Sequence, residues 1–385
     1  MEINLDKIKC DDIVKILFAE NPGVIIQVAD KHKSEVKKIL DEAGVGYVKI
    51  GVPTEERHIL VTKHDATYQF GIDYLRDVWY STSYLLDRKQ SMNGCAKKRF
   101  ENYKQQPLEV VFDKSFTGKL SQFGLNPDRR TPSGIKAAII REKGTNGERE
   151  MAYMLYLAGF DVKDVTMTDL VSGRETLEDI NMVVYCGGFS NSDVLGSAKG
   201  WAGSFLFNPK AKAALDNFYA REDTLSLGVC NGCQLMMELG LITPEDKKKG
   251  KMLHNDSHKF ESAFLGVTVP MNRSVMFGSL SGSKLGIWVA HGEGKFSLPY
   301  PEDHYNVVLK YSYDEYPGNP NGSDYSVAGI ASQDGRHLAM MPHLERACFP
   351  WENAYYPLDR KDNDQITPWM EAFVNARKWV EAHKK

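Results

Sequence analysis

From residue 135 onward, the chain alternates short apolar runs with helical patterns. Strands are predicted at KAAII (136–140), FDVKDV (160–165), NMVVYC (181–186) and TLSLGV (224–229). One helix face between the first two strands is formed by Met151, Met154, Leu155 and Ala158, with Asn146 as its predicted cap. Further strands are predicted at IWVAH (287–291), NVVLKY (306–311), VAGIAS (327–332) and RHLAMM (336–341), and a last helix after Pro368. This alternation favours an α/β fold, a mostly parallel sheet with helices on both faces.

The first part of the chain has a different pattern, typical of a small α+β segment. Apolar residues recur at helical spacing over 36–43, and a second helix is predicted over 70–87. Strands are predicted at GVIIQVA (23–29), VKIGV (48–52) and HILVTK (58–63). Glycine, proline and charge replace any periodicity over 118–134, which indicates a linker. We therefore predict an α+β domain over 1–117, a linker over 118–134 and an α/β domain over 135–385.

Composition narrows the class of protein. The 385 residues carry a formal net charge of -3 and are 42% hydrophobic, so nothing demands a nucleic-acid or anionic-membrane partner. No apolar run reaches the roughly 18 residues of a membrane span, and the start MEINLDKIKCDD is too polar for a secretory signal. The six cysteines are then expected to be free thiols in a reducing, cytoplasmic compartment.

The sharpest chemical feature is LGVCNGCQ, residues 227–234. A predicted strand runs into Gly228-Val229-Cys230-Asn231-Gly232, and a helical pattern follows, as in a nucleophile elbow. The N-terminus of that helix favours thiolate over thiol at Cys230. The same N–H groups, including that of Asn231, are natural donors to an oxyanion. We interpret Cys230 as a nucleophile.

The pair Cys230-x-x-Cys233 also fits a redox or zinc site. A structural zinc ion takes about four ligands, and no second C-x-x-C or nearby H-x₃₋₅-H accompanies this pair. We favour Cys233 as a small buried residue of the helix.

A thiolate hydrolase needs a base and a group that orients it. Two pairs qualify, His291 with Glu293 and His343 with Glu345, because residues two apart in an extended segment point the same way. Spacing does not choose between them. The position of His343 just beyond a predicted strand favours the second pair, since ligands gather at the carboxyl ends of parallel strands.

A third feature is YCGGFSNSD, residues 185–193, where a predicted strand ends in Gly187-Gly188. Paired glycines let backbone N–H groups approach a ligand closely, and they would complete an oxyanion hole with the Asn231 amide. A plain tight turn is the alternative.

Together these segments resemble class I glutamine amidotransferases. GVCNGCQ, CGGFS, GSAKGWAGSFLFN, AHGEGKF and MPHLER are similar in particular to the glutaminase domain of the large phosphoribosylformylglycinamidine synthases, over about residues 135–385. The resemblance implies a flavodoxin-like sheet and a triad of Cys230 as nucleophile, His343 as base and Glu345 as its orienter. It also implies oxyanion donors at Gly188 and Asn231, a substrate-holding Gln234, and His291 near the site.

Residues 14–112 resemble the end of the synthetase portion of those enzymes. The resemblance thus implies a glutaminase without its own cofactor or metal, whose ammonia serves the ATP- and Mg-dependent conversion of formylglycinamide ribonucleotide in purine biosynthesis. The synthetase active site is expected to lie outside this chain, with the rest of the synthetase as partner. Two alternatives are a docking or regulatory module that is inactive until its partner binds, and another thiol hydrolase on the same fold. Asn191-Ser192 departs from the tyrosine-glycine common in the family.

Overall fold

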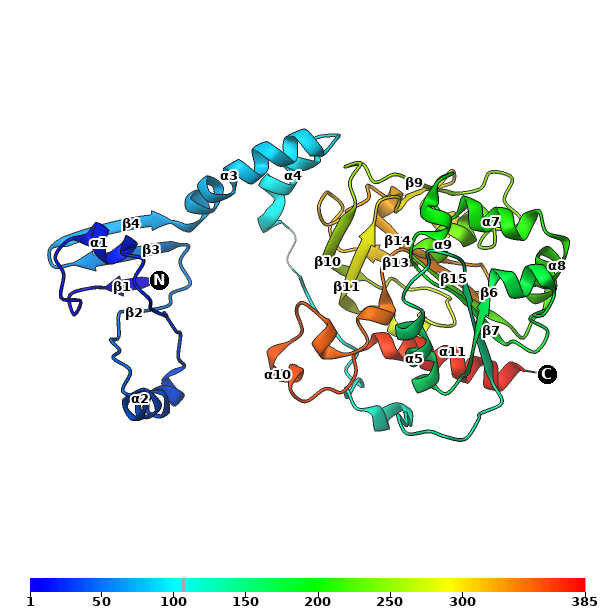
Figure 1. The fold of residues 1–385 in the computed structure, drawn as a ribbon, viewed down its shortest axis with the longest axis horizontal. Coiled ribbons are helices and arrows are strands. Elements are labelled where there is room, and N and C mark those ends of the chain that lie inside the picture. The colour runs from blue at the N-terminus through cyan, green and yellow to red at the C-terminus, as the bar shows by residue number, and fades with distance from the viewer. Residues whose placement is uncertain (106–107, 385) are drawn as a thin grey trace. The chain divides into compact units, whose positions relative to one another are not determined.

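The computed structural model describes residues 1–105 and 108–384, which form two compact units, Met1–Leu86 and Asp87–Lys385 (Figure 1). This division falls earlier in the chain than the boundary at residue 117 that the sequence led us to expect. The predicted α+β domain, linker and α/β domain therefore stay predictions. Each unit is described by itself.

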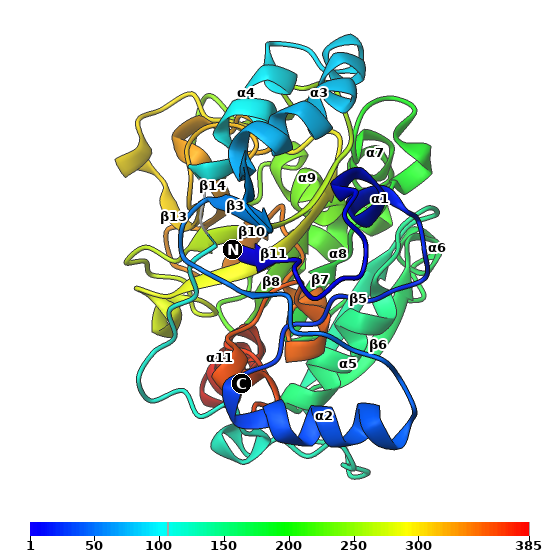
Figure 2. The same cartoon turned by 90° about the vertical axis from the view of Figure 1, so that its left-hand side faces the viewer.

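The first unit contains a four-stranded sheet in the order β2-β1-β3-β4. Its strands are β1 Glu2–Asn4, β2 Gly51–Val52, β3 His58–Lys63 and β4 Ala66–Gly71. Its helices are α1 Ile13–Phe18, α2 Lys33–Glu42 and most of α3 Ile72–Gln90. Figures 1 and 2 show α2 set apart from the sheet at the end of two extended segments. The predictions of α2, α3 and β3 are confirmed.

The predicted strand over 23–29 is wrong. These residues have no regular structure, and Val24 and Ile25 are 87% and 79% exposed. Within residues 1–86 the buried side chains are those of Leu5, Val61 and Lys63. A run of β-branched residues becomes a strand only where a neighbouring strand pairs with it, and none does here.

The second unit is built on a nine-stranded sheet in the order β11-β10-β13-β14-β15-β8-β7-β5-β6. Strands β6, β5, β7, β8 and β15 are mutually parallel, and the other four continue the sheet in antiparallel pairs. Their bounds are β5 Lys136–Arg141, β6 Asp161–Thr166, β7 Met182–Tyr185, β8 Leu225–Val229, β10 Glu261–Thr268, β11 Lys284–His291, β13 Asn306–Tyr311, β14 Val327–Ala331 and β15 His337–Met340. A separate two-stranded sheet joins β9 Lys251–Leu253 and β12 Lys295–Ser297.

Two groups of helices cover this sheet. The first pairs α5 Glu148–Ala158 with α11 Trp369–His383, and the second comprises α6 Met167–Ser172, α7 Lys199–Leu206, α8 Pro209–Ala220 and α9 Asn231–Glu238 (Figure 1). The largest fully buried side chains of this unit are those of Trp201, Trp369, Tyr185, Phe160 and Phe205. The α/β fold class is confirmed, and the parallel strands bring their carboxyl ends to one edge, where ligands of such sheets bind.

Residues 87–134 lie within the second unit. The described residues of this stretch include the end of α3, the helix α4 Cys95–Glu101 and two 3-10 helices at Asn102–Lys104 and Leu120–Phe123. The segment predicted as a linker is attached to the C-terminal region through the Gly118 carbonyl, which accepts a hydrogen bond from the Gln365 amide at 2.7 Å. The short helix α10 Leu358–Lys361 lies in that C-terminal region.

All six cysteines are free thiols, as predicted. None of the described helices combines the length and the apolar character needed to cross a membrane.

Candidate active site

Cys230 occupies a strained turn between β8 and α9. Its backbone has φ 54° and ψ -108°, a region that non-glycine residues rarely adopt. The turn is tight because the neighbouring backbone segments almost touch: a Cβ atom on Gly232 would lie 2.0 Å from the Tyr185 carbonyl oxygen. A Cβ atom on Gly228 would lie 2.5 Å from the Gly232 carbonyl oxygen. The two glycines of the G-x-C-x-G motif are therefore required by sterics.

His343 and Glu345 follow β15 and lie beside this turn. The His343 Nδ1 atom is 2.6 Å from Glu345 Oε1, and both side chains are buried. A Cβ atom placed on Gly187 would lie 2.9 Å from His343 Cε1 and 3.3 Å from Cys230 Cβ. The imidazole and the cysteine thus flank the same bare backbone. With Nδ1 engaged by the carboxylate, Nε2 is the nitrogen left for proton transfer.

The electrostatics of this pair favour a charged imidazole. Burial alone would lower the pKa of His343, but the Glu345 carboxylate and the Cys230 sulfur outweigh it and raise the pKa to about 10. For Glu345, burial opposes ionisation, and the charge and hydrogen bond of His343 nevertheless lower its pKa. Both shifts favour an imidazolium–carboxylate pair at neutral pH.

The backbone N–H of Gly188 points away from the neighbouring loop of residues 144–146. The Gly187 carbonyl accepts a hydrogen bond from the Asn146 amide, and the Phe189 amide donates to the Gly144 carbonyl, both at 2.9 Å. In a trans peptide, C=O and N–H point in opposite directions, so the Gly188 N–H faces away from residues 144–146. Its φ of 121° and the 2.6 Å that would separate a Cβ atom from the Gly144 oxygen explain why glycine stands here.

Asn231 ties the elbow to its surroundings. Its Oδ1 atom accepts a hydrogen bond from the Ser190 amide at 3.0 Å, and its Nδ2 atom donates to Gln234 Oε1 at 2.8 Å. Gln234 in turn donates through Nε2 to the Glu293 carbonyl oxygen at 2.8 Å. The Asn231 backbone N–H lies in the first turn of α9, where the helix offers it no acceptor.

The loop after Gly188 has an unusual backbone. Asn191, Ser192 and Asp193 have φ of 53°, 57° and 48°, so three consecutive non-glycine residues are left-handed. The Asp193 carboxylate accepts hydrogen bonds from the Ala198 amide at 3.2 Å and from Asn231 Nδ2 at 3.3 Å. These contacts hold the loop against the elbow despite the conformational cost.

His291, the last residue of β11, also lies at the site but without a carboxylate partner. Its side chain is 2% exposed, and within the part of the chain that the structure describes neither ring nitrogen has a hydrogen-bond partner. Burial, with the charge of His343, lowers its pKa to about 3. Glu293 instead accepts a hydrogen bond from Ser197 Oγ at 2.9 Å. Of the two H-x-E pairs, only His343 and Glu345 are brought together.

Cys233 is fully buried on α9, as we favoured from the sequence, and burial raises the pKa of its thiol well above the usual range. A buried, protonated thiol is a poor nucleophile and a poor metal ligand.

Residues 134–380 match the family described as the CobB/CobQ-like glutamine amidotransferase domain. The chain belongs to this family.

Curated relatives match almost the whole length of the chain. It is 37% identical to phosphoribosylformylglycinamidine synthase of Homo sapiens over 96% of its length, and 35% identical to that of Drosophila melanogaster over 94%. It spans only 29% and 28% of those two proteins. Among solved structures, PurLQS from Thermotoga maritima is similar, with 26% identity, a TM-score of 0.47, and coverage of 65% of this chain and 99% of that one.

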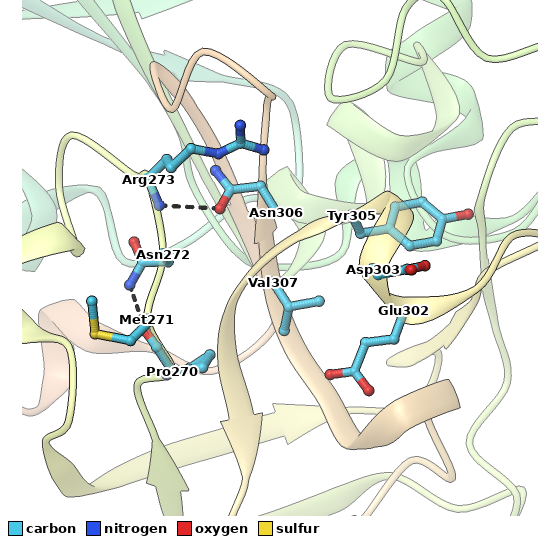
Figure 3. A pocket seen from close by; sticks show the side chains of 9 residues that line it. All are labelled: Pro270, Met271, Asn272, Arg273, Glu302, Asp303, Tyr305, Asn306 and Val307. Carbon is cyan, nitrogen blue, oxygen red and sulfur yellow. Dashed lines mark hydrogen bonds between the residues drawn. The ribbon is translucent and has the colours of Figure 1, made fainter.

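Away from this edge, the amidotransferase unit has a surface pocket of about 640 Å³, drawn in Figure 3. It is lined by residues 270–273, which follow β10, and by Glu302, Asp303, Tyr305, Asn306 and Val307, which lie before and at the start of β13. Asn306 pairs with Ala331 at the end of β14 that is remote from Met340, so the pocket lies at the edge of the sheet opposite Cys230. It contains none of the residues singled out from the sequence. No cluster of three or more metal-ligating side chains occurs among the described residues.

Proposed function

We propose that this amidotransferase hydrolyses glutamine to glutamate and ammonia with a triad of Cys230, His343 and Glu345. The observation that carries the proposal is the position of a buried His343, bonded to Glu345 at 2.6 Å and flanking with Cys230 the bare backbone of Gly187. A nucleophile, a base and an orienting carboxylate in this order are the parts that a thiolate hydrolase needs.

In the first step, the Cys230 thiolate attacks the side-chain carbonyl of glutamine. The N–H groups of Gly188 and Asn231 stabilise the oxyanion. As the C–N bond breaks, the His343 imidazolium gives its proton to the departing ammonia, and a glutamyl thioester remains on the sulfur. The high pKa of His343 suits this acid role, because the ring enters the step already protonated.

In the second step, water attacks the thioester and passes a proton to His343. The C–S bond breaks, glutamate leaves, and the thiolate–imidazolium pair is restored. Gln234 completes the substrate side of the site. Its amide already bridges Asn231 and the Glu293 carbonyl, so its part is to fix the shape of the wall that receives glutamine.

The ammonia is proposed to serve the ATP-dependent conversion of formylglycinamide ribonucleotide to the amidine, in purine biosynthesis and in the cytoplasm. The names of the two relatives support this, and the chain spans less than a third of their length. ATP and Mg would belong to the synthetase portion, which is also the proposed partner. The exposed apolar side chains of the first unit, Val24 and Ile25 among them, support a partner surface there.

A partner-gated module is the second candidate, and the same exposed surface favours it. In that case the triad is formed but turns over only when the synthetase portion is bound.

Acid quenching during turnover tests the proposal. With isotope-labelled glutamine, we expect a glutamyl adduct on the peptide that contains Cys230, and none on that peptide in Cys230→Ser. If no adduct forms, a glutamine-analogue chloromethyl ketone distinguishes the candidates. Selective alkylation of Cys230 without turnover identifies the gated module, and absence of both adduct and alkylation refutes the triad.

A further inference from the structure

The turn formed by residues 291–294, together with Ala290 before it, contacts residues in and beside the proposed glutaminase site. The carbonyl of Ala290, just before it, lies 3.7 Å from Cys230 Sγ. Its Glu293 carbonyl accepts the Gln234 amide at 2.8 Å, and the Glu293 carboxylate accepts the Ser197 hydroxyl at 2.9 Å. A shift of this turn would therefore move the surroundings of the nucleophile, the glutamine wall and the neighbouring loop together.

Asn255 holds this turn by three hydrogen bonds. Its backbone amide donates to the Gly292 carbonyl at 2.9 Å, and its Nδ2 atom donates to the His291 carbonyl at 2.7 Å. Its Oδ1 atom accepts from the Gly294 amide at 2.9 Å. Asn255 is fully buried, so water does not compete for these bonds.

The 254–261 segment, which carries Asn255, is held in turn by residues 87–101. The Met92 amide donates to the Ser257 carbonyl at 3.0 Å, and Asn93 Nδ2 donates to the Asp256 carbonyl at 2.8 Å. Contacts between stretches about 160 residues apart therefore fix the backbone directly after Asn255.

A compact cluster of charges completes this attachment. Arg99 donates to Asp87 Oδ2 at 2.8 Å and to Glu261 Oε2 at 3.1 Å. Lys259 donates to Asp87 Oδ1 at 2.8 Å, so two cations face two carboxylates. Asp87 and Glu261 are 7% and 8% exposed, and the Arg99 guanidinium lies 5.0 Å from the centre of the Tyr316 ring. Burial makes this cluster specific in geometry, because a single misplaced partner would leave a charge unpaired.

We propose that residues 87–101 position the glutaminase site, with Arg99 and Asn255 as positioning residues that act through the 291–294 turn. This inference rests on the proposed function and identifies the segment that controls the geometry of its site. Asp87 belongs to the last turn of α3, the helix whose first residue, Ile72, lies in the first unit. The hydrogen bonds thus run from the link between the two units to the glutamine wall.

The alternative is that the charge cluster only stabilises the fold. Arg129 offers a matched control: it pairs with Asp161 at 2.9 Å, lies 4.9 Å from the centre of the Tyr156 ring, and has a side-chain exposure of 20% against 24% for Arg99. Asp161 begins β6, at the edge of the sheet opposite Cys230. Arg99→Met and Arg129→Met therefore each remove an arginine–aspartate pair and a contact with a tyrosine ring, from different places.

The test compares these variants in the full chain by glutamate release and by hydrogen exchange of residues 291–294. We expect Arg99→Met to lower kcat/KM for glutamine about 10- to 100-fold, the scale on which small displacements of a site act. We expect faster exchange of the Gly294 amide in that variant and no change of either kind in Arg129→Met. Arg99→Lys keeps the positive charge but loses the planar guanidinium group that binds two carboxylates, so it should retain more activity than Arg99→Met. It replaces Arg99→Met in the test if that variant does not fold.

Equal effects of Arg99→Met and Arg129→Met on activity and exchange would overturn the inference and leave the proposed function intact. If wild-type protein shows no Cys230-dependent release, alkylation of Cys230 decides separately between the gated module and failure of the proposed triad. Exchange at Gly294 then still decides, since an unchanged rate in the Arg99 variants would overturn the positioning role.

Discussion

Replacing Glu345 by glutamine isolates the electrostatic part of the triad. The substitution keeps the size of the side chain and an oxygen that can face His343 Nδ1, which is now 2.6 Å from the carboxylate, and removes only the charge. Burial of the imidazole, the largest influence on His343, is then opposed only by the Cys230 sulfur, and we expect it to lower the pKa of His343, as it does for His291, whose pKa is about 3 in the same region without a carboxylate. We expect His343 to be neutral at pH 7–8 in Glu345→Gln.

The size of the effect follows from the pKa of His343. A rise from 6.5 to about 10 corresponds to a preference for the protonated ring on the order of 5 kcal/mol. Because the folded-state pKa is raised, the pair contributes stability that is fully present below about pH 6.5 and is lost as pH rises through about 10. The wild-type free energy of unfolding should therefore fall between pH 7 and 9 by up to about 1.4 kcal/mol per pH unit more than that of Glu345→Gln.

The assay is the ¹⁵N chemical shift of the His343 ring, assigned by its loss in His343→Asn, together with urea unfolding at pH 7, 8 and 9. Glutamate release should fall by about 10⁴-fold in Glu345→Gln, the loss seen when the carboxylate that orients a catalytic imidazole is replaced. Glu381→Gln is the control, because Glu381 pairs with Arg377 on α11 and the lowered pKa of Glu381 confines its effect to acid pH. A His343 ring that is equally protonated at pH 8 in wild type and Glu345→Gln would refute the reasoning.

Two further predictions use paired substitutions. His343→Asn should abolish glutamate release, whereas His291→Asn should leave measurable release, because of these two histidines only His343 has a carboxylate partner. Steady-state kinetics of both variants tests this, and an equal loss of activity would contradict the assignment of His343 as the base. Gly232→Ala should lower the thermal unfolding midpoint sharply, since its Cβ atom would lie 2.0 Å from the Tyr185 carbonyl oxygen. Gly278→Ala, whose Cβ atom would have its nearest contact at 4.0 Å, should leave the midpoint almost unchanged. Similar midpoints for the two variants would show that the elbow has room for a side chain at Gly232.

The sequence predicted the parts of the molecule that depend on local pattern. The apolar runs of β5, β7 and β8 are buried throughout or nearly so, which is what a central parallel strand requires. The left-handed backbone of Cys230 and the steric role of Gly232 follow from the elbow motif. The choice of His343 over His291 was only favoured by pattern, and the position of Glu345 is what distinguishes them.

What the sequence missed depends on distant partners. β10 was not predicted, because most of its side chains are only partly buried and no clean alternation marks it. Asn146 was expected to cap α5, but Gly147 stands at the cap and Asn146 Oδ1 instead accepts from Arg346, 200 residues away. The link from Arg99 to Glu261 joins residues 162 apart, and no local rule indicates it.

Glutamate release from glutamine by the purified chain, with Cys230→Ala beside Cys233→Ala, tests the central claim most directly. Cys230 is the N-cap residue of α9 and Cys233 lies in the first turn of that helix, and both are buried. Of the two, only Cys230 lies at the strained elbow beside His343. We predict that Cys230→Ala abolishes release and that Cys233→Ala retains it. Release that persists in Cys230→Ala would contradict the account.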